Sequence, residues 1–368
     1  TTSEVYAADQ LFATLDPTLR RLELDDLGPV VLAYAAGILF GNLPGLHLDE
    51  HFGQDLAGGA VLLAVPLLLF TTDLKAWLKL ARPLLLSFLF ACIAAVIAAA
   101  AVGWAFRHET DEWWKVAGML VGVYVGGTAN MSAVGLALET RQETFVVLNT
   151  ADVICGGAYL FFLLSVAQRL LSTVLPRFSL VLRDEGPGTS AAPTVRTRAL
   201  ALSIAAVCVG LSVGLSLALL GSLHIGVVML GITTLGIAAS LVPGVRRLPG
   251  STEVGDYALL VFCAAMGSLA DVSRVNGASL MLLAFVALVM VLAAFLHFTL
   301  CAVFRIDVDT ALISSAATIF GPPFIGPVAA ALGNRALVGP GLTLGLMGIA
   351  LGTYLGLATA WALRALGG

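Results

Sequence analysis

Apolar stretches of roughly membrane-spanning length, separated by short polar segments, follow one another along the chain from Leu27 onward. A bilayer core requires about 20 apolar residues in a helix, and several of the stretches approach or exceed that length. The pattern therefore predicts a bundle of membrane-spanning helices. The nine uninterrupted stretches are residues 28–43, 57–73, 83–106, 144–174, 198–220, 223–243, 255–271, 277–304 and 336–365.

Two further apolar stretches, at about 115–139 and 309–333, are interrupted by polar residues, glycine and proline. The first break is Gly126-Gly-Thr-Ala-Asn-Met-Ser132, and the second is Ser314-Ser-Ala-Ala-Thr-Ile-Phe-Gly-Pro-Pro-Phe324. Because hydrocarbon cannot hydrogen-bond a backbone, irregular structure at membrane depth must be buried in protein or face water. Two broken helices at matching positions in two halves indicate the binding site of a transporter.

The same order of stretches occurs twice, on either side of a polar linker at 176–197. Residues 27–175 form the first predicted repeat and residues 198–368 form the second. Stretch 198–220 has no apolar counterpart in the polar N-terminal segment 1–26, so the first repeat is one helix shorter. Internal repeats are typical of secondary transporters, and chance similarity between apolar sequences is the alternative.

The distribution of Lys and Arg predicts how the broken stretches sit in the membrane, because these residues favour cytoplasmic loops. If both broken stretches crossed completely, the basic linker would lie opposite the loop that carries Lys75, Lys79 and Arg82. If each enters and returns on one side, the basic groups share the cytoplasmic side. Loops 44–56 and 221–224, which contain no Lys or Arg, then lie outside. The charges favour re-entrant hairpins and two repeats of inverted orientation.

Composition agrees with this picture and narrows the function. Of the 368 residues, 59% are hydrophobic and only 11% are charged, and the mean hydropathy is +0.98. A soluble domain of this size covers its surface with charge, so we predict an all-α polytopic membrane protein with about nine to eleven transmembrane segments. The sequence has no Walker A, HExxH, GxSxG or Ser-His-Asp pattern, so we expect no enzyme and no ATP-driven pump.

The first break offers a set of oxygen atoms for a ligand. Gly127 leaves nearby carbonyl groups free, and Thr128, Asn130 and Ser132 supply hydroxyl and amide oxygens. Such oxygens replace the hydration shell of a hard cation or bind the polar groups of a substrate. The alternative is that the small residues only permit close packing, with Ser and Thr bonded back to their own helix.

The second break is stiffer than the first. Pro322 and Pro323 remove amide donors and so release upstream carbonyl groups. Ser315 and Thr318 lie on the arm before the break, and Phe320 flanks it. We predict that these residues contribute to substrate binding, and a proline kink inside a packed helix is the alternative.

Asp152 is the strongest single candidate for a functional residue. A carboxylate inside an apolar stretch costs free energy in the membrane, so a functional role is the default hypothesis. It could bind Na⁺ or carry a proton, with Asn149, Thr128 and Asn130 as the other predicted ligands. The alternative is an interfacial residue near the start of its helix. His297 has no metal partner at ligand spacing, so we expect a packed or hydrogen-bonded side chain.

The chain resembles the bacterial membrane proteins grouped as domain of unknown function 819. The resemblance rests on Tyr124-Val-Gly-Gly-Thr-Ala-Asn130, on Ala151-Asp152, and on Phe320-Gly-Pro-Pro323 through Leu337-Val-Gly-Pro-Gly341. That family is similar in outline to sodium/glutamate and sodium/citrate symporters, which implies inverted repeats, re-entrant hairpins and an elevator motion. The family usually begins with an extra apolar helix that residues 1–26 lack, so we expect that an N-terminal helix has been removed.

The sequence thus predicts a secondary transporter in the cell inner (plasma) membrane for a small polar metabolite that carries a carboxylate, coupled to Na⁺ or H⁺. A passive channel or facilitator is the alternative, and a membrane scaffold without transport is a third hypothesis. We expect contact with the lipid bilayer, a homodimer, no nucleic acid and no cofactor beyond Na⁺ as the coupling ion. The predicted scaffold and dimer contacts are stretches 28–43, 57–73, 198–220, 223–243 and 255–271.

Overall fold

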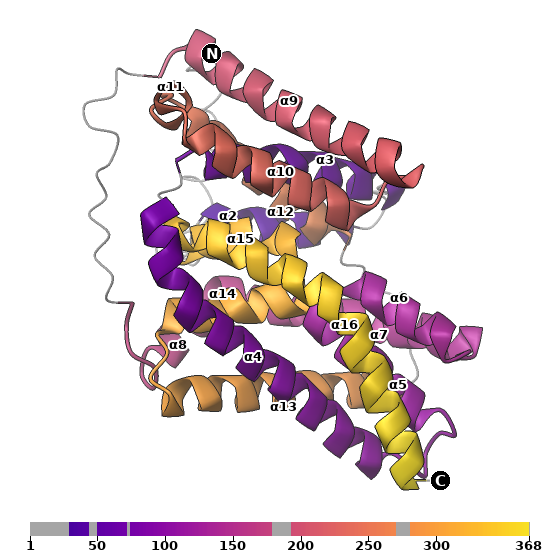
Figure 1. Ribbon diagram of the computed structural model, residues 1–368. Helices are drawn as coiled ribbons and strands as arrows, with labels where there is room; N and C mark the ends of the chain where they lie inside the picture. The colour runs from indigo at the N-terminus through magenta and orange to yellow at the C-terminus, as the bar shows by residue number, and fades with distance from the viewer. Residues whose placement is uncertain (1–28, 44–49, 72–73, 179–192, 270–279, 368) are drawn as a thin grey trace.

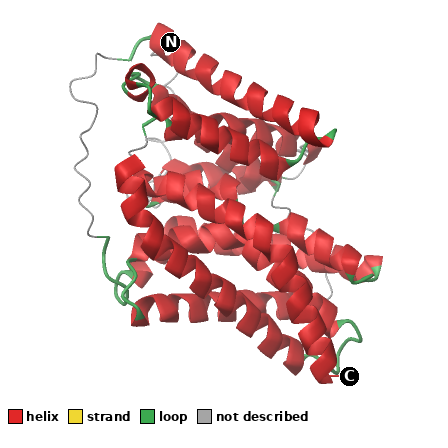
Figure 2. Ribbon diagram, in the orientation of Figure 1, coloured by secondary structure: helices red, strands yellow, loops and turns green. Residues whose placement is uncertain are grey.

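The computed structural model describes residues 29–43, 50–71, 74–178, 193–269 and 280–367. Within these residues the chain is helical and contains no strand (Figure 2). The predicted N-terminal segment 1–26 and most of the linker 176–197 lie outside the described residues.

The helices correspond to the predicted apolar stretches, but α3 begins at Glu50 rather than at residue 57, inside the predicted loop 44–56, and α4 begins at Leu74 rather than at residue 83. They are α2 (Pro29–Gly41), α3 (Glu50–Leu69), α4 (Leu74–Ala105), α5 (Trp113–Gly126), α6 (Thr128–Ala137), α7 (Gln142–Ser165), α8 (Ala167–Leu171), α9 (Val195–Leu220), α10 (Ile225–Ser240), α11 (Pro243–Arg246), α12 (Ser251–Ser268), α13 (Leu280–Val303), α14 (Val308–Ile319), η4 (Pro322–Phe324), α15 (Ile325–Ala331), η5 (Arg335–Leu337) and α16 (Val338–Gly367). The predicted stretch 144–174 is divided at Val166 into α7 and α8. Just before the division, the Ser165 hydroxyl donates to the Phe161 carbonyl.

Six helical segments in the described part of the chain are long and apolar enough to cross a membrane. They are residues 51–69, 81–105, 142–165, 195–220, 280–303 and 335–367. The chain is therefore built as a membrane protein. Three further predicted stretches form helices that fall outside this set, because α2 and α10 have only 13 and 16 residues and α12 carries acidic residues.

The two predicted breaks are confirmed as turns between helices. Hairpin 1 consists of α5 and α6, joined at Gly127 with φ of 83°. Hairpin 2 consists of α14, η4 and α15, and its turn begins at Gly321 with φ of 76°. Both angles lie in the left-handed region, which glycine enters without a steric penalty. The glycines therefore allow each chain reversal.

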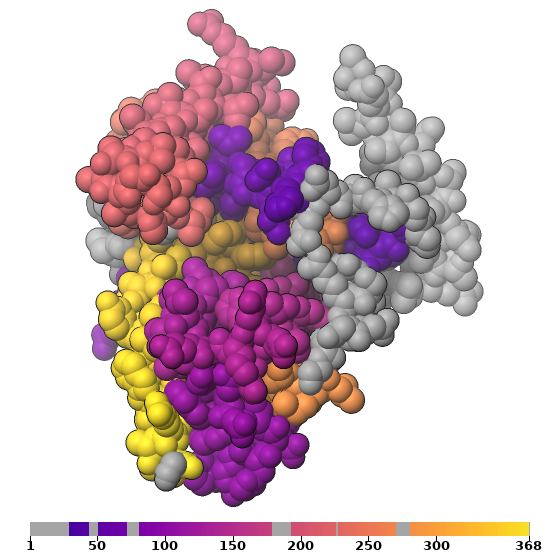
Figure 3. All heavy atoms as spheres, turned by 90° about the vertical axis from the view of Figure 1, so that its right-hand side faces the viewer, coloured from indigo at the N-terminus to yellow at the C-terminus, as the bar shows by residue number. Residues whose placement is uncertain are grey.

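The helices separate into two groups that lie one above the other in Figure 1. The scaffold group consists of α2, α3, α9, α10, α11 and α12, and the hairpin group consists of α4 to α8 and α13 to α16. Figure 3 shows the same division from the side, with α9 and α10 above α5, α6 and α7. Inside the scaffold group, α2 and α12 touch through their backbones, because a Cβ atom on Gly37 would lie 2.2 Å from the Ala264 carbonyl oxygen. Close backbone contact through glycine is typical of packed membrane helices.

Candidate functional site at the two hairpin tips

The base of hairpin 1 is closed by Glu112, which precedes α5 and is only 5% exposed. Its carboxylate accepts hydrogen bonds from Lys115 Nζ at 3.0 Å and from Arg141 N and Nε at 3.1 and 3.0 Å. Lys115 Nζ also donates to the Glu139 carbonyl at 2.9 Å. Because Glu139 and Arg141 follow α6, these bonds bring the end of the hairpin back to its beginning.

The same contacts lower the pKa of Glu112 and so favour its charged form. Burial by itself raises its pKa, but hydrogen bonds from Thr144, Lys115 and Arg141 outweigh burial and lower the pKa of Glu112 from 4.5 to about 2. A carboxyl group whose folded-state pKa is depressed stabilises the fold above its unfolded pKa. That stability is lost as the pH falls through the folded-state value.

We expect Glu112→Gln to destabilise hairpin 1 by about 1–2 kcal/mol at neutral pH, because each pKa unit is worth about 1.36 kcal/mol and solvent around the exposed Arg141 side chain screens part of the interaction. The measurement is the melting temperature of the purified protein between pH 7 and pH 3. The difference between wild type and variant should shrink as the pH falls below about 4.5. Glu109→Gln is the control, because Glu109 is exposed. Equal melting temperatures for wild type and Glu112→Gln at neutral pH would contradict the assignment.

The base of hairpin 2 is closed by Asp309, which lies in the first turn of α14 and is also 5% exposed. Its two carboxylate oxygens accept hydrogen bonds from Gln168 Nε2 and Asn334 Nδ2, both at 2.9 Å. Asn334 follows α15, so these bonds return the second hairpin to its own beginning. The sequence analysis missed this closure, because nothing in the local pattern pairs an acid with an amide 25 residues away.

The tips of both hairpins rest on α16 within one turn of each other. A Cβ atom on Gly345 would lie 2.8 Å from the Pro322 nitrogen, and one on Gly348 would lie 2.2 Å from the Val125 carbonyl oxygen. Three residues advance a helix by about 4.5 Å. The turn of hairpin 2 and the end of α5 therefore meet on neighbouring positions of one helix, and only glycine fits at either position.

At the first tip, the predicted residues have different environments. Thr128 and Ser132 are exposed, and the Ser132 hydroxyl donates to the Thr128 carbonyl at 3.1 Å. Asn130 is buried and bonded through both amide atoms: its Nδ2 donates to the Gly126 carbonyl at 2.8 Å, and its Oδ1 accepts from Thr353 N and Oγ1 at 3.1 and 2.5 Å. Asn130 therefore fastens the tip to α16.

At the second tip, the predicted residues form a packed arm, and the half-buried Phe320 contacts a buried tyrosine. The Ser315 hydroxyl is 2.7 Å from the Tyr159 hydroxyl, and the Thr318 hydroxyl donates back to the Ser314 and Ser315 carbonyls at 3.1 and 2.9 Å. The Phe320 ring stacks on Tyr159 at a centroid distance of 6.2 Å. Beyond it, Pro322 is buried and Pro323 is partly exposed.

Asp152 lies in the middle of α7 and is 8% exposed. At 1.5 Å per residue it is about 15 Å along the helix from Gln142, which places it far from the helix entrance. The Tyr124 side chain of α5 lies near its carboxylate, without a hydrogen bond between the two groups. Among the described residues, both the Tyr124 hydroxyl and the Asn149 Oδ1 atom are buried without a hydrogen-bond partner.

Because Tyr124 belongs to α5, the structure brings Asp152 next to hairpin 1, near the end of its first arm. The other predicted ligands, Thr128 and Asn130, lie beyond the turn at Gly127. Tyr124 was missed by the sequence analysis, since an aromatic residue in an apolar helix is an ordinary core residue.

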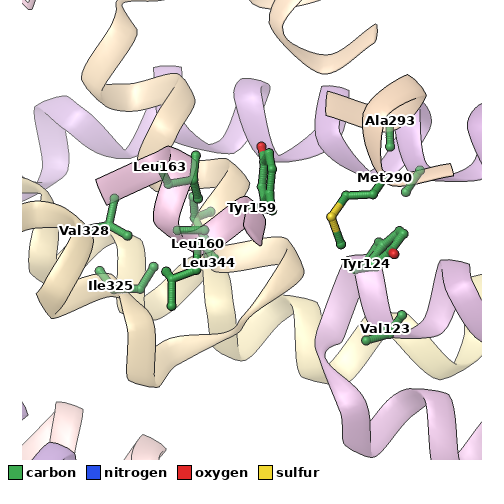
Figure 4. Close-up of a cluster of buried hydrophobic side chains, with 14 of the residues drawn as sticks. Val123, Tyr124, Tyr159, Leu160, Leu163, Met290, Ala293, Ile325, Val328 and Leu344 are labelled. Atoms are coloured by element: carbon green, nitrogen blue, oxygen red, sulfur yellow. The ribbon is translucent and has the colours of Figure 1, made fainter. Parts of the chain in front are cut away.

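Helix α7 also reaches hairpin 2, through Tyr159 and through Gly156, where a Cβ atom would lie 3.5 Å from the Phe320 ring. Figure 4 shows Tyr124 and Tyr159 inside one buried cluster, with Leu160 of α7 near Leu344 of α16. Helices α7 and α16 thus each contact both hairpins.

A buried polar cluster lies behind the first arm of hairpin 2. The Ser87 hydroxyl of α4 is 3.1 Å from His297 Nε2 and 2.5 Å from the Ser314 hydroxyl, and it contacts the Cys301 sulfur at 3.3 Å. The prediction of a hydrogen-bonded His297 is confirmed. Ser87 gave no signal in the sequence, because single serines are common in membrane helices.

Comparison with known proteins gives matches over nearly the whole chain. The family model described as protein of unknown function (DUF819) matches residues 27–366. The uncharacterized membrane protein YjcL of Bacillus subtilis strain 168 is 25% identical over 347 residues, which cover 89% of this chain and 87% of that protein. A stretch of 39 residues is 62% identical to the GTPase HflX of Escherichia coli K12, but it covers 11% of this chain and 9% of the GTPase. So short a match says nothing about the function of the whole chain.

Proposed function

We propose, from the premise that the chain belongs to the DUF819 family of membrane proteins, that it is an elevator-type secondary transporter for a small carboxylate. The observation that supports this most is the meeting of two hairpin tips on α16, beside a buried aspartate on α7. Broken helices that meet inside a membrane protein provide backbone and side-chain groups for a polar substrate. We place the protein in the cell inner membrane as a multi-pass protein.

The contacts between helices support two repeats related by a two-fold axis, as the proposed inverted repeats would be. Helix α2 packs on α12 as α10 packs on α3, α4 contacts α16 as α13 contacts α7, and α2 contacts α7 as α10 contacts α16. In each pair, the second contact is the first with every helix replaced by its equivalent in the other repeat. The equivalent helices are α2 and α10, α3 and α12, α4 and α13, and α7 and α16. This exchange is the behaviour expected of two repeats related by a two-fold axis.

The groups at the tips favour a substrate that is small, polar and anionic. Thr128 and Ser132 are the exposed hydroxyl residues of the first tip. Helix α6 begins at Thr128, so the free amide groups of its first turn lie at the tip. The positive end of a helix dipole stabilises a carboxylate placed there. The partly exposed ring of Phe320 provides an apolar wall on the side of hairpin 2.

Asp152 is the group that we assign to the coupling ion. One carboxylate with neutral oxygens nearby, from Tyr124 and Asn149, is a donor set that suits a hard cation, and the carboxylate alone suits a proton. Within the described residues, no three His, Cys, Asp or Glu side chains form a group that could hold a metal ion. The proposed site therefore uses a single acid with oxygen ligands.

The boundary between the two helix groups supports an elevator motion. It is made largely by hairpin 2 and the residues after it, where Phe324 packs on Phe262 at 5.2 Å and Arg335 pairs with Asp256 at 2.5 Å. Because hairpin 2 forms most of this boundary, the hairpin group could slide along the scaffold group and carry the binding site with it.

The test is a screen of melting temperature against small mono-, di- and tricarboxylates, each measured with and without Na⁺ and at two pH values. We expect one chemical class to raise the melting temperature, and the increase to depend on Na⁺ or on pH. Uptake of that compound into proteoliposomes should then follow the ion gradient. Uptake that runs down the substrate gradient and ignores both ions would identify a passive facilitator instead.

We also propose a homodimer that forms through α9, which lies at the edge of the molecule in Figure 1. Gly210 and Gly214 are exposed, and a Cβ atom on either would meet nothing within 4 Å. With Ala206 and Ala218 they form an exposed stripe of small residues, the pattern that lets two membrane helices approach closely.

We expect Gly210→Leu and Gly214→Leu each to raise the dissociation constant of the dimer by about tenfold or more. A leucine side chain at either position would prevent the close approach of the two helix backbones that glycine permits. The measurement is the monomer–dimer ratio at several dilutions in lipid nanodiscs. Val291→Leu is the control, since Val291 is 68% exposed on α13 of the hairpin group. Dimers that keep their affinity in both glycine variants would exclude α9 as the interface.

A further inference from the structure

One end of the hairpin group gathers most of the tryptophans of the chain. Of the five in the sequence, Trp104 lies at the end of α4, Trp113 and Trp114 begin α5, and Trp361 lies in the last turns of α16. These helix ends lie together at the lower right of Figure 1. The Trp104 and Trp113 rings meet edge to face at 5.9 Å. Because tryptophan concentrates where a membrane protein passes from hydrocarbon to water, we place this end at the membrane surface.

Cationic side chains lie over two of these rings. Arg364 of α16 and Lys115 of α5 both lie over the Trp114 ring, with their cationic groups 5.1 and 5.6 Å from its centroid. Arg107, just after α4, lies over the Trp104 ring at 4.7 Å. A cation over an aromatic face is attracted by the electrons of the ring. The rings therefore hold positive charges at this end of the molecule.

Arg364 has no acidic partner in the described part of the chain. It is exposed, and so are Glu109 and Asp111 of the loop between α4 and α5, yet neither acid forms an ion pair with it. A guanidinium group carries five N–H donors and no acceptor. The donors of Arg364 are thus available to an acceptor from outside the chain.

Lys115 has one donor left beside Arg364. Its ammonium group donates to the Glu112 carboxylate at 3.0 Å and to the Glu139 carbonyl at 2.9 Å, the two bonds that help to close the base of hairpin 1. An ammonium group has three donors. The third can therefore bind the same external acceptor as the guanidinium group that shares its ring.

The surface that leads to Arg364 is apolar and aromatic. Leu351, Tyr354, Ala358 and Trp361 are exposed on α16 and follow one another at spacings of three or four residues, so they lie on one face of the helix. Arg364 comes three residues after Trp361 and continues this face to the helix end. An apolar face that ends in a cation at the membrane surface matches a phospholipid, with the acyl chain along the face and the phosphate at the cation.

We propose that this face of α16 binds an anionic phospholipid, whose phosphate is held by Arg364 and Lys115 beside Trp114. A guanidinium group binds a phosphate through two parallel hydrogen bonds, and the free ammonium donor adds a third. Because Lys115 also closes the base of hairpin 1 and α16 receives both hairpin tips, the bound lipid links the two elements on which the candidate site is built. The lipid site does not depend on the proposed transport.

The experiment measures lipid binding to delipidated protein in detergent by native mass spectrometry, without any substrate. The probes are anionic phosphatidylglycerol and zwitterionic phosphatidylcholine with the same acyl chains. We expect phosphatidylglycerol to bind more tightly, and Arg364→Gln to weaken its binding by about fivefold or more, the effect of one basic residue near a membrane surface. Arg196→Gln is the control, since Arg196 is an exposed arginine on α9 of the scaffold group. It removes the same charge and should leave the affinity unchanged.

A second measurement covers the case in which Arg364→Gln does not fold. In lipid nanodiscs, brominated phosphatidylglycerol added as a minor component should quench the tryptophan fluorescence of the wild type more than the same fraction of brominated phosphatidylcholine. Arg364→Lys keeps the charge and loses the paired hydrogen bonds. It should therefore show a smaller preference for the anionic lipid than the wild type.

Equal binding of phosphatidylglycerol by the wild type and Arg364→Gln would overturn the lipid site, as would equal quenching by the two brominated lipids. Displacement of bound phosphatidylglycerol by inorganic phosphate would overturn it as well, and would identify a site for a soluble anion. None of these results would affect the transporter hypothesis, which is tested separately by the screen of carboxylates.

Discussion

A zinc bridge between Asp256→His and Arg335→His is expected to lock the protein with the tip of hairpin 1 open to one side of the membrane. These two positions form the ion pair that joins α12 of the scaffold group to η5 of the hairpin group, with 2.5 Å between Arg335 Nη2 and Asp256 Oδ2. Two imidazoles placed there would hold Zn²⁺ between the groups. The bound Zn²⁺ should prevent the hairpin group from moving relative to the scaffold group.

The readout is the labelling of Thr128→Cys by an impermeant maleimide from each side of the membrane. Thr128 is exposed at the tip, and the five native cysteines are replaced beforehand. Without Zn²⁺, both sides should label. With Zn²⁺, labelling from one side should fall by about tenfold or more, which corresponds to a bias of 1.4 kcal/mol between the two states.

Removal of Zn²⁺ with a chelator should restore labelling from both sides, which makes the same protein its own control. Arg335→His alone should not respond to Zn²⁺, because a single imidazole does not bridge the groups. Two-sided labelling that persists in the locked double variant would contradict the elevator and favour a fixed pore.

The breaks at the hairpin tips were predictable because their chemistry is local. Gly127 and Gly321 take the left-handed backbone that glycine tolerates best, and Pro322 cannot continue a hydrogen-bonded helix. The backbone preferences of glycine and proline therefore indicate a turn from the local sequence alone. Helix starts were less predictable, because segments that contain charged residues open α3 at Glu50 and α4 at Leu74, several residues before the apolar stretches begin.

The surroundings of the tips were not predictable, because they depend on contacts between distant segments. Gly345 and Gly348 lie in a glycine-rich helix, and only the folded chain shows that these two receive the tips. Tyr124 became a site residue only because α5 places it beside Asp152. Ser87 and His297 are 210 residues apart and meet through the packing of α4 on α13.

The predicted ligand set around Asp152 illustrates the limit of spacing arguments. Thr128 and Asn130 were chosen because they lie in the same break, yet Asn130 is bonded to Gly126 and Thr353. Asn149, one turn before Asp152 on α7, keeps a buried and unpartnered oxygen. Periodicity along a single helix was therefore a safer guide to neighbours than proximity within a loop.

Asp152→Asn is expected to preserve the fold and to lower ion-dependent substrate binding by about tenfold or more, where each decade is about 1.4 kcal/mol. Asparagine keeps the volume of the side chain, so the packing of α7 should survive. It removes the charge that would attract Na⁺ and the carboxyl group that would carry a proton. The measurement is the affinity for the compound identified by melting temperature, as a function of Na⁺ and of pH.

The control is the same substitution at Asp55, an exposed carboxylate on α3. Asp55→Asn should leave binding and its dependence on ions unchanged. If Asp152→Asn behaved like the control, Asp152 would be a buried structural acid, and the transporter hypothesis would rest on the hairpins alone. A variant that still binds the substrate but has lost its response to Na⁺ or pH would assign the coupling ion to this carboxylate. Because Asp152 lies next to α5 while the exposed hydroxyls of Thr128 and Ser132 lie beyond the turn, we expect this separation of the two effects.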